Sequence, residues 1–197
     1  MLLIFGYNLS QKEEIKFFSG SFNEALVVAK NSNKLIYLDC QTAWCGPCKS
    51  MAKNVFTNKA VASFYNDQFV SLSIDMDKER MGLKQEFRIT TYPTHLYFNA
   101  SGELIHRSIG YQSSSQFIQT GENALNPLKQ NGSLELRYQQ GERNPNFLIE
   151  YLSYLSINKL SMVEVFDAYL TRIPADSLNT IKVNNLILQC TQSTRSL

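Results

Sequence analysis

Two cysteines separated by two residues are the part of this sequence best suited to chemistry. The stretch Trp44–Lys49 reads Trp-Cys-Gly-Pro-Cys-Lys and holds two of the four cysteines and the single tryptophan of the 197-residue chain. Thiols at this spacing can close and reopen a disulfide, or they can supply half of a structural zinc site. The other candidate zinc ligands, Cys40, His95, His106 and Cys190, include no second close pair. We therefore expect a redox centre that uses no metal and no cofactor.

A helix that begins at this motif would make the two thiols chemically unequal. The thiolate is the form that attacks a disulfide, and an ordinary thiol, with a pKa of about 8.5, is mostly protonated at neutral pH. At a helix N-terminus, Cys45 would face unpaired backbone amides and the positive end of the helix dipole, which stabilise its thiolate. Cys48, one turn further in, is expected to be more buried and less ionised. The spacing thus predicts that Cys45 attacks the substrate disulfide and that Cys48 resolves the mixed disulfide.

The two residues between the cysteines suit the same role. Gly46 has no side chain and lets a substrate backbone approach closely. Pro47 fixes a backbone dihedral angle early in the helix, where the loss of an amide proton costs little. Both residues are therefore expected to border the substrate.

Helix and strand signals alternate between residues 20 and 125. Ser21–Glu24 is a capping box that predicts a helix start, and Lys34–Cys40 is a nearly continuous apolar run that predicts a strand covered on both faces. Phe69–Asp75 alternates as a second strand, and the β, α, β, α order predicts parallel strands joined by crossover helices. The other predicted elements are a helix introduced by Asn58, a short helix over Arg80–Phe87, a hairpin of Thr94–Phe98 with Glu103–Ser108, and a closing helix over Ser114–Leu125.

Residues 126–197 carry helix signals and no strand signals. Asn144–Pro145 predicts a helix start, an apolar stripe runs from Leu148 to Leu155, and Ser161–Glu164 is a second capping box. A third, weaker helix is predicted over Ser177–Gln189. The unit resembles one helical hairpin of the tetratricopeptide kind, of which three or more copies are usually needed for independent stability. We expect this helical extension either to dock on the first domain or to belong to a longer, incomplete array.

The first ten residues, Met1–Ser10, are short, apolar and uncharged, and charged residues follow directly. This pattern is typical of the remnant of a secretory signal peptide, although its apolar part is shorter than the usual length of about 7 to 15 residues. The alternative is an ordinary N-terminal segment. No apolar run approaches the roughly 20 residues of a membrane-spanning helix. We expect a periplasmic or exported protein, with a cytoplasmic location as the alternative, because one reactive cysteine pair fits either compartment.

The charge pattern argues against nucleic acid as a partner. The net charge of +2 comes from 19 basic and 17 acidic residues spread along the chain without a basic run. The apolar content of 44% is ordinary for a globular protein. A chain of this length can hold one well-buried domain with an appendage, or two small domains.

At several separated positions the sequence resembles the thioredoxin family. Asp39 lies six residues before Cys45, where thioredoxins carry a buried acid that exchanges protons with the inner cysteine. Tyr92-Pro93-Thr94 opens the next strand, where the family has a cis-proline beside the disulfide, and Gly110 stands where the family has a glycine lining the substrate groove. The resemblance implies an α/β thioredoxin fold, with a central mixed sheet flanked by helices, over residues 11–125. A short all-α extension over residues 126–197 would follow.

The resemblance also implies a thiol-disulfide oxidoreductase that reduces protein disulfides and receives electrons from a thioredoxin-reductase-like or membrane thiol donor. The implied catalytic residues are Cys45, Cys48 and Asp39. The implied substrate-binding residues are Trp44, Gly46, Pro47, Tyr92, Pro93, Thr94 and Gly110. More narrowly, the chain resembles exported thioredoxin-like proteins of Bacteroidetes-type bacteria, some of which carry a helical extension. The alternatives are a redox-sensing or partner-binding module with the same fold, and a merely turn-capping role for Asp39.

Four positions depart from the thioredoxin pattern: Gln41 and Thr42, where the family has an aromatic-rich segment, Ser71 and Tyr92. Ser71 stands where the family has a lysine near the buried acid, so we expect Asp39 to be harder to ionise because no cation offsets its burial. Tyr92 replaces a commoner aliphatic residue and is expected to add a hydrogen-bonding ring to the substrate groove. His95, two residues past Pro93, is expected to be a strand side chain, and Cys40 a small core residue.

Overall fold

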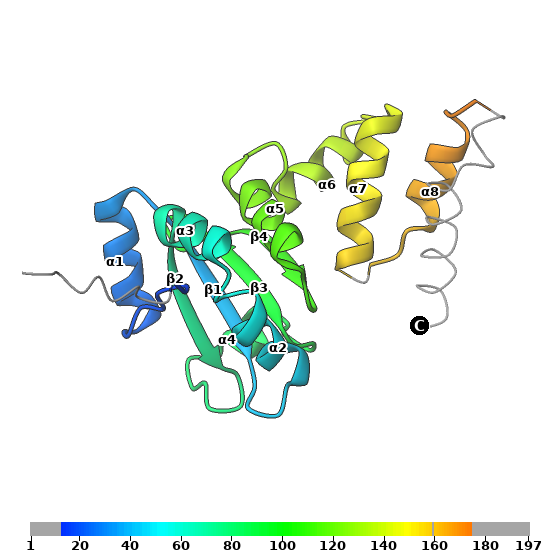
Figure 1. The fold of residues 1–197 in the computed structure, drawn as a ribbon. Helices are drawn as coiled ribbons and strands as arrows, with labels where there is room; N and C mark the ends of the chain where they lie inside the picture. Colours follow the sequence, from blue (N-terminus) through cyan, green and yellow to red (C-terminus); the bar gives the residue numbers. More distant parts are fainter. Residues whose placement is uncertain (1–12, 159, 175–197) are drawn as a thin grey trace, which may run out of the picture.

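The computed structural model describes residues 13–158 and 160–174 (Figure 1). The predicted signal-peptide remnant, residues 1–10, and the predicted third helix of the extension, Ser177–Gln189, lie outside the described residues. Export therefore stays a prediction.

A four-stranded mixed sheet forms the centre of the fold, with the strand order β2-β1-β3-β4. β1 pairs in parallel with β2, β3 pairs antiparallel with β1, and β4 pairs antiparallel with β3. The predicted parallel pair and the predicted hairpin are thus confirmed. The strands are β1 (Leu35–Gln41), β2 (Phe69–Asp75), β3 (Thr94–Phe98) and β4 (Leu104–Ile109).

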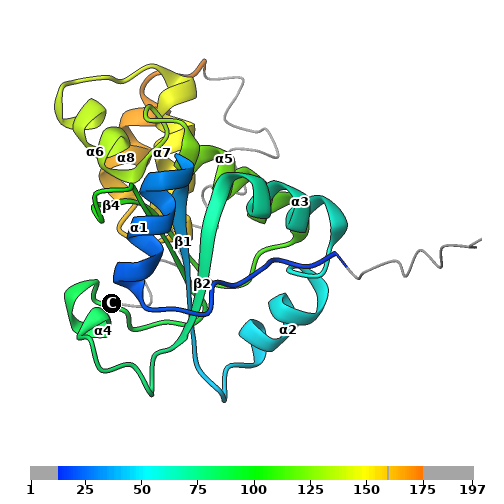
Figure 2. The ribbon, with the colours of Figure 1, turned by 90° about the vertical axis from the view of Figure 1, so that its left-hand side faces the viewer.

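Helices cover both faces of this sheet, as Figure 2 shows with α1 and α4 on one side of β2 and α2 and α3 on the other. The helices before residue 126 are α1 (Phe22–Ser32), α2 (Gly46–Asn54), α3 (Lys59–Gln68), α4 (Leu83–Glu86) and α5 (Ser114–Leu125). Alternate residues of β1 point to opposite faces, so Ile36 and Leu38 pack with α1 and α4, while Tyr37 packs with α2, α3 and α5. This arrangement is the expected α/β fold.

Polar side chains cap the helices where the sequence predicts them to begin. Ser21 accepts a hydrogen bond from the Glu24 amide in a capping box, and the Asn58 side chain accepts hydrogen bonds from two amides at the start of α3. The predicted helix over Arg80–Phe87 is shorter in the structure, where α4 begins after Gly82, whose φ is +79°. Glycine adopts this conformation without a steric penalty, so Gly82 can turn the chain and the helix begins at the next residue, Leu83.

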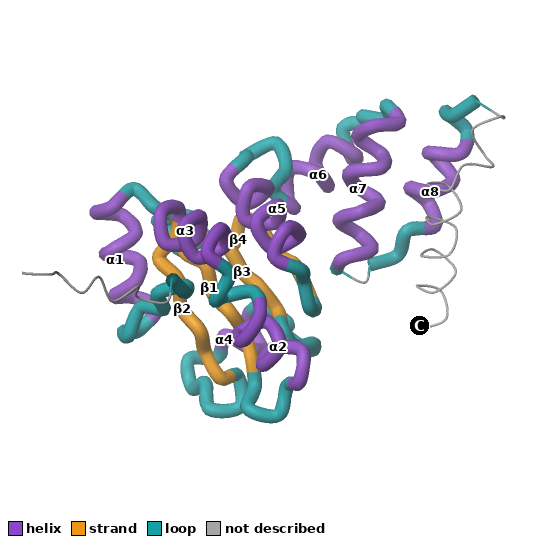
Figure 3. Tube along the Cα trace, viewed as in Figure 1, coloured by secondary structure: helices purple, strands orange, loops and turns teal. Residues whose placement is uncertain are grey.

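Three further helices follow α5 in the described part of the chain, and Figure 3 shows no strand among them. They are α6 (Asn131–Gln139), α7 (Pro145–Ile157) and α8 (Val163–Leu170). Asn144 caps α7 as predicted, by accepting from the Phe147 amide at 2.9 Å. The predicted capping box at Ser161–Glu164 is wrong, because α8 begins after Met162 without a side-chain cap. α6 was not predicted, since its sequence has no clear apolar stripe.

The helical extension docks on the edge of the sheet. α6 and α7 contact β4, and the Asn131 side chain accepts a hydrogen bond from the backbone amide of Arg107 on that strand. A cavity of about 220 Å³ lies between β4, α5, α6 and α7. None of the predicted site residues lines this cavity. The first of the two expected arrangements, docking on the preceding domain, is the one observed.

The extension has its own hydrophobic core, centred on residues such as Leu148 and Leu152, which are fully buried. We expect Leu148→Ala to lower the free energy of unfolding of this part by about 2–5 kcal/mol, because it leaves a cavity. Hydrogen exchange measured by mass spectrometry should then accelerate in α6–α8 and stay slow in β1 and β3. Leu136→Ala is the matched control, since Leu136 is 52% exposed. Equal effects of the two substitutions would contradict this assignment of the core.

Candidate active site

A disulfide joins Cys45 and Cys48 at the N-terminus of α2, with the two Cα atoms 5.3 Å apart. Cys45 is the N-cap residue of the helix, and its Sγ accepts a hydrogen bond from the Cys48 amide at 3.1 Å. This contact and the helix dipole both favour negative charge on Cys45. The expectation that Cys48 is the more buried cysteine is wrong for the oxidised pair, in which Cys45 is 2% and Cys48 7% exposed. Their difference therefore lies in the contact with the helix terminus and not in burial.

Asp39 lies on the central strand β1, on the face that α2 covers. Tyr37, two residues earlier on the same face, packs in one cluster with residues of α2, so Asp39 lies beneath the start of that helix. The carboxyl is only 4% exposed. Burial raises its pKa from 3.8 to about 7, and a hydrogen bond from the Ser73 hydroxyl at 2.9 Å partly opposes this rise. The expected difficulty in ionising Asp39 is confirmed.

The residue that faces Asp39 from the neighbouring strand is Ser73. Register pairs Asp39 with Ser73, whereas Ser71 pairs with Tyr37. The Ser71 hydroxyl is buried and has no hydrogen-bond partner within the described part of the chain. Sequence reasoning considered Ser71 and missed Ser73, because only the strand register identifies the neighbour. Ser73 is itself exposed, so its hydroxyl links the buried carboxyl with solvent.

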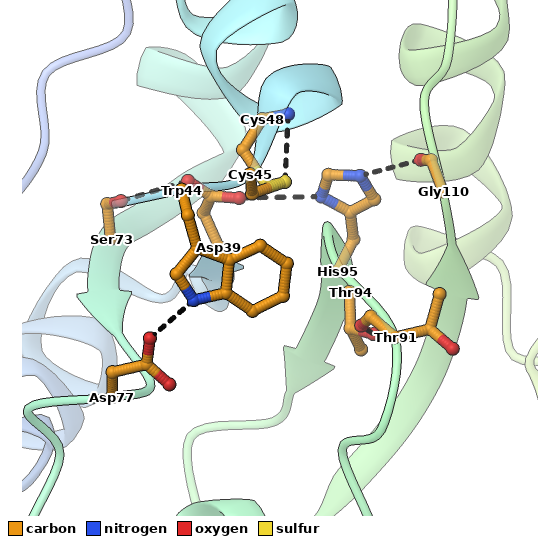
Figure 4. Close-up of a disulfide and its surroundings, with 10 residues drawn as sticks. All are labelled: Asp39, Trp44, Cys45, Cys48, Ser73, Asp77, Thr91, Thr94, His95 and Gly110. Carbon is orange, nitrogen blue, oxygen red and sulfur yellow. Dashed lines mark hydrogen bonds and ion pairs between the residues drawn. A yellow bond between two sulfur atoms is a disulfide. The ribbon is translucent and has the colours of Figure 1, made fainter. Parts of the chain in front are cut away.

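His95 faces Asp39 from the other side, on β3. Its Nδ1 lies 3.9 Å from Asp39 Oδ1, and its Nε2 lies 3.3 Å from the carbonyl oxygen of Gly110 (Figure 4). Nδ1 also lies 2.9 Å from the Tyr37 hydroxyl. Burial lowers the pKa of His95 to about 4, although the contact with Gly110 acts in the opposite direction. The imidazole is therefore neutral at pH 7, and its approach to Asp39 is not an ion pair.

Beside the cysteines, the predicted substrate-binding residues differ in exposure: Trp44 is exposed, Tyr92 is half-buried, and Pro93 and Thr94 are buried. The Trp44 indole donates to Asp77 at 2.7 Å, and its ring meets that of Tyr92 edge to face. Gly46 and Pro47 are both exposed between the buried cysteines, and a side chain at Gly46 would meet nothing within 4 Å. The Tyr92 hydroxyl is buried without a partner among the described residues, so it is not presented to a groove as expected.

The loop at Pro93 is tied to the end of β4. The Tyr92–Pro93 peptide bond is cis, as predicted. The Pro93 carbonyl accepts a hydrogen bond from the Gly110 amide at 2.8 Å. Thr94, the first residue of β3, donates through its hydroxyl to the Thr91 carbonyl at 2.6 Å. The structure thus brings Pro93 and Gly110 together, whereas the Thr94 side chain stabilises the loop through its hydrogen bond to Thr91.

Within residues 13–158 and 160–174, no group of three or more His, Cys, Asp or Glu side chains could hold a metal ion. In the same residues, no helix is long and apolar enough to cross a bilayer.

The fold and the cysteine pair match known proteins. A family model described as a thioredoxin-like domain matches residues 22–125, which is more than half of the chain. This chain belongs to the thioredoxin-like family. The match ends at Leu125, the last residue of α5, so α6, α7 and α8 lie outside the matched range.

Individual relatives support the same family. Thioredoxin-1 of Drosophila melanogaster is 36% identical over 72 residues, which are 36% of this chain and 64% of that protein. Thioredoxin H2 of Arabidopsis thaliana is 37% identical over 90 residues, which are 45% of this chain and 59% of that protein. The chain thus spans less than two thirds of either relative.

Two solved structures are also similar to this chain. The solution structure of a proposed disulphide-isomerase from Bacteroides thetaiotaomicron is 37% identical and has a TM-score of 0.54, and the match covers 59% of this chain and 98% of that one. A thioredoxin from Thermus thermophilus, with 16% identity and a TM-score of 0.54 over 66% of this chain and 99% of its own, shows likeness of fold alone.

The raised pKa of Asp39 makes the stability of the protein depend on pH. Between about pH 4 and pH 7 the folded state keeps a proton on Asp39 that the unfolded state has lost, so stability falls as the pH rises through this window. Asp39→Asn should remove this loss and raise the free energy of unfolding at pH 8 by about 1.4 kcal/mol for each pH unit between the two pKa values. Urea unfolding from pH 4 to pH 8 measures the effect.

The control for this experiment is Asp67→Asn, which removes an exposed carboxylate. It should leave the wild-type pH dependence in place. If Asp39→Asn and the wild-type protein lose stability equally between pH 4 and pH 8, the carboxyl does not have the raised pKa.

Proposed function

We propose that this thioredoxin-like protein is a thiol-disulfide oxidoreductase that passes two electrons from the Cys45–Cys48 dithiol to disulfides of protein substrates. The observation that carries the proposal is the disulfide at the N-terminus of α2, with Cys45 Sγ accepting the Cys48 amide. A sulfur in this position has a stabilised thiolate, which is what disulfide exchange requires. The family membership supports the same activity.

The exchange runs in two steps. In the reduced protein, the Cys45 thiolate attacks one sulfur of the substrate disulfide, and the other substrate sulfur leaves as a thiolate that takes a proton from water. Cys48 then gives its thiol proton to the Asp39 carboxylate, and its sulfur attacks Cys45 Sγ. This step closes the Cys45–Cys48 disulfide and releases the first substrate sulfur. The protein is oxidised by two electrons, and an external thiol donor must restore the dithiol.

Asp39 must lose its new proton before the next turnover. Its Oδ2 accepts a hydrogen bond from the exposed Ser73 hydroxyl at 2.9 Å, which offers the proton a path to solvent. A carboxyl with a pKa of about 7 is suited to this exchange, because it both accepts and releases a proton near neutral pH. The catalytic residues in this proposal are Cys45, Cys48 and Asp39.

Substrate binding is assigned to the surface around the disulfide. In this proposal Trp44, Gly46 and Pro47 contact the substrate from the helix side, and Tyr92, Pro93 and Gly110 contact it from the loop side, while the fully buried Thr94 supports that loop. An extended stretch of polypeptide on either side of the substrate cysteine would lie across these residues. The electron donor is proposed to be a thioredoxin-reductase-like protein or a membrane thiol donor.

A second candidate is disulfide isomerisation, which the description of the 37% identical protein of Bacteroides thetaiotaomicron favours, and oxidation of substrate thiols would be the reverse of the proposed direction. The reduction potential of the Cys45–Cys48 pair separates the directions. We expect a value near the roughly −270 mV of thioredoxins, and a value near the roughly −120 mV of a strong periplasmic oxidant would reverse the proposed direction. Equilibration with glutathione or dithiothreitol buffers, followed by thiol alkylation, gives this value.

Reduction of insulin by dithiothreitol tests the activity itself. The wild-type protein should accelerate insulin reduction, and Cys45→Ser should be inactive because it lacks the attacking sulfur. Cys48→Ser should accumulate a mixed disulfide between Cys45 and the substrate, visible by non-reducing electrophoresis. Cys40→Ser is the matched control, since this buried cysteine lies outside the pair. A wild-type protein without activity would favour the redox-sensing or partner-binding alternative.

The pH dependence tests the role of Asp39. The rate of the resolving step should rise with pH through about 7, because Asp39 accepts the Cys48 proton only in its ionised form. Asp39→Asn should flatten this rise and slow the step on the order of a hundredfold. Stopped-flow measurement of the tryptophan fluorescence of Trp44, the single tryptophan of the chain, can follow the step. An unchanged pH profile in Asp39→Asn would exclude the carboxyl as the proton acceptor.

A further inference from the structure

His95 is a fully buried polar side chain to which the disulfide exchange assigns no role. It lies on β3 between Asp39 of β1 and Ser108 of β4 in the sheet register. In Figure 4 its ring lies between the Asp39 carboxyl and the Gly110 carbonyl. An imidazole in such a place is unfavourable unless both of its nitrogens have partners, and here both do.

The partners of His95 fix which nitrogen carries its proton. A carbonyl oxygen can only accept, so the 3.3 Å contact with Gly110 requires that Nε2 carries the proton and donates it. In the neutral ring Nδ1 is then an acceptor, and the Tyr37 hydroxyl at 2.9 Å donates to it. The Gly110 carbonyl thus requires the Nε2–H tautomer, and the Tyr37 hydroxyl, which can donate or accept, stabilises that tautomer by donating to Nδ1.

Gly110 is held on both sides by these contacts. Its amide donates to the Pro93 carbonyl at 2.8 Å, and its carbonyl accepts from His95. Its φ of +90° lies in the region that favours glycine, directly after the last residue of β4. The orientation of this peptide relative to the loop at Pro93 therefore depends on the imidazole beneath it.

We propose that His95 is a positioning residue of the substrate groove, which holds the Gly110 carbonyl through Nε2 and is itself held in the required tautomer by the Tyr37 hydroxyl. This inference rests on the proposed function, because it assigns Gly110 to the surface on which the substrate lies. Its effect is on binding: with His95 in place, Gly110 and Pro93 present one fixed backbone shape to the substrate polypeptide.

If the role of His95 were only structural, it would satisfy the buried carbonyl without affecting substrate binding. Steady-state kinetics separates this structural role from the proposed positioning role. His95→Asn and His95→Gln are a matched pair, since the amide of asparagine reaches only the position of Nδ1 while that of glutamine reaches the position of Nε2. With insulin as substrate, we expect His95→Asn to raise KM about fivefold with kcat little changed, as for the loss of one hydrogen bond. His95→Gln should restore most of the wild-type KM.

The tautomer is tested independently by nitrogen NMR of the imidazole rings. The chain has two histidines, so the spectrum of His95→Gln assigns the signals of His95 and His106. We expect the Nε2–H form in the wild-type protein, a second tautomer in Tyr37→Phe, and a raised KM in that variant. Tyr97→Phe is the control, because the Tyr97 hydroxyl bonds Tyr65 at 2.7 Å. It should change neither the spectrum of His95 nor KM.

The outcomes separate this inference from the proposed function. If the wild-type protein reduces insulin, while His95→Asn and Tyr37→Phe both keep the wild-type KM, the inference fails and the function stands. A wild-type tautomer protonated at Nδ1 would also overturn the inference. If Cys45→Ser reduces insulin as the wild-type protein does, the proposed function fails. If His95→Asn does not fold, Tyr37→Phe still decides the question through its tautomer and its KM.

Discussion

Burial of a carboxyl group in the middle of a sheet makes its ionised form costly in free energy, and the other polar groups of this site lie around that carboxyl group. Asp39 lies on β1 under the start of α2, with one hydroxyl donor and, within the described residues, no cation against it, so its charged form is disfavoured. When the carboxylate takes a proton from Cys48, the negative charge moves from Asp39 to the Cys48 sulfur, and it leaves with the substrate thiolate when the Cys45–Cys48 disulfide closes. The same transfer that creates the attacking thiolate therefore relieves the unfavourable burial of the acid.

Because side chains alternate along a strand, the buried polar residues lie on one face of β1 and β3, and an apolar cluster lies on the other face. On the face under α2, α3 and α5, β1 and β3 carry Tyr37, Asp39, His95 and Tyr97. On the opposite face, the same strands carry aliphatic and other apolar residues that pack against α1 and α4. One face can thus hold buried polar groups because the other supplies hydrophobic burial on the same strands.

The sequence allows much of the fold to be predicted, because the determinants are local. The capping box at Ser21, the cap at Asn58 and the apolar run of β1 each specify an element through neighbouring residues. Ser73 and His95 could not be assigned to Asp39 in this way. Their positions depend on the register of three strands, and a shift of one residue would turn each side chain to the other face.

Within the helical extension, α6 and the start of α8 were not predicted correctly, and the reason is different. α6 has little periodicity, and its place is set by tertiary contacts with β4. The false capping box at Ser161 shows the converse, since a matching local pattern is not used when the chain enters α8 from Met162. Local signals are thus reliable where the helix packs on a continuous sheet and less so where short helices pack on one another.

Both outer strands of the sheet are shielded along their free edges. At β2, a single parallel bridge joins Phe17 to Ser71, and the Phe18 amide donates to the Ser71 carbonyl at 2.7 Å. At β4, the Asn131 side chain accepts a hydrogen bond from the backbone amide of Arg107, which points away from the sheet. A chain shortened to the thioredoxin-like part would lose the second shield and expose a backbone ladder on which another molecule could add a strand. The appended helices therefore cover part of a sheet edge whose backbone amides would otherwise be free to pair.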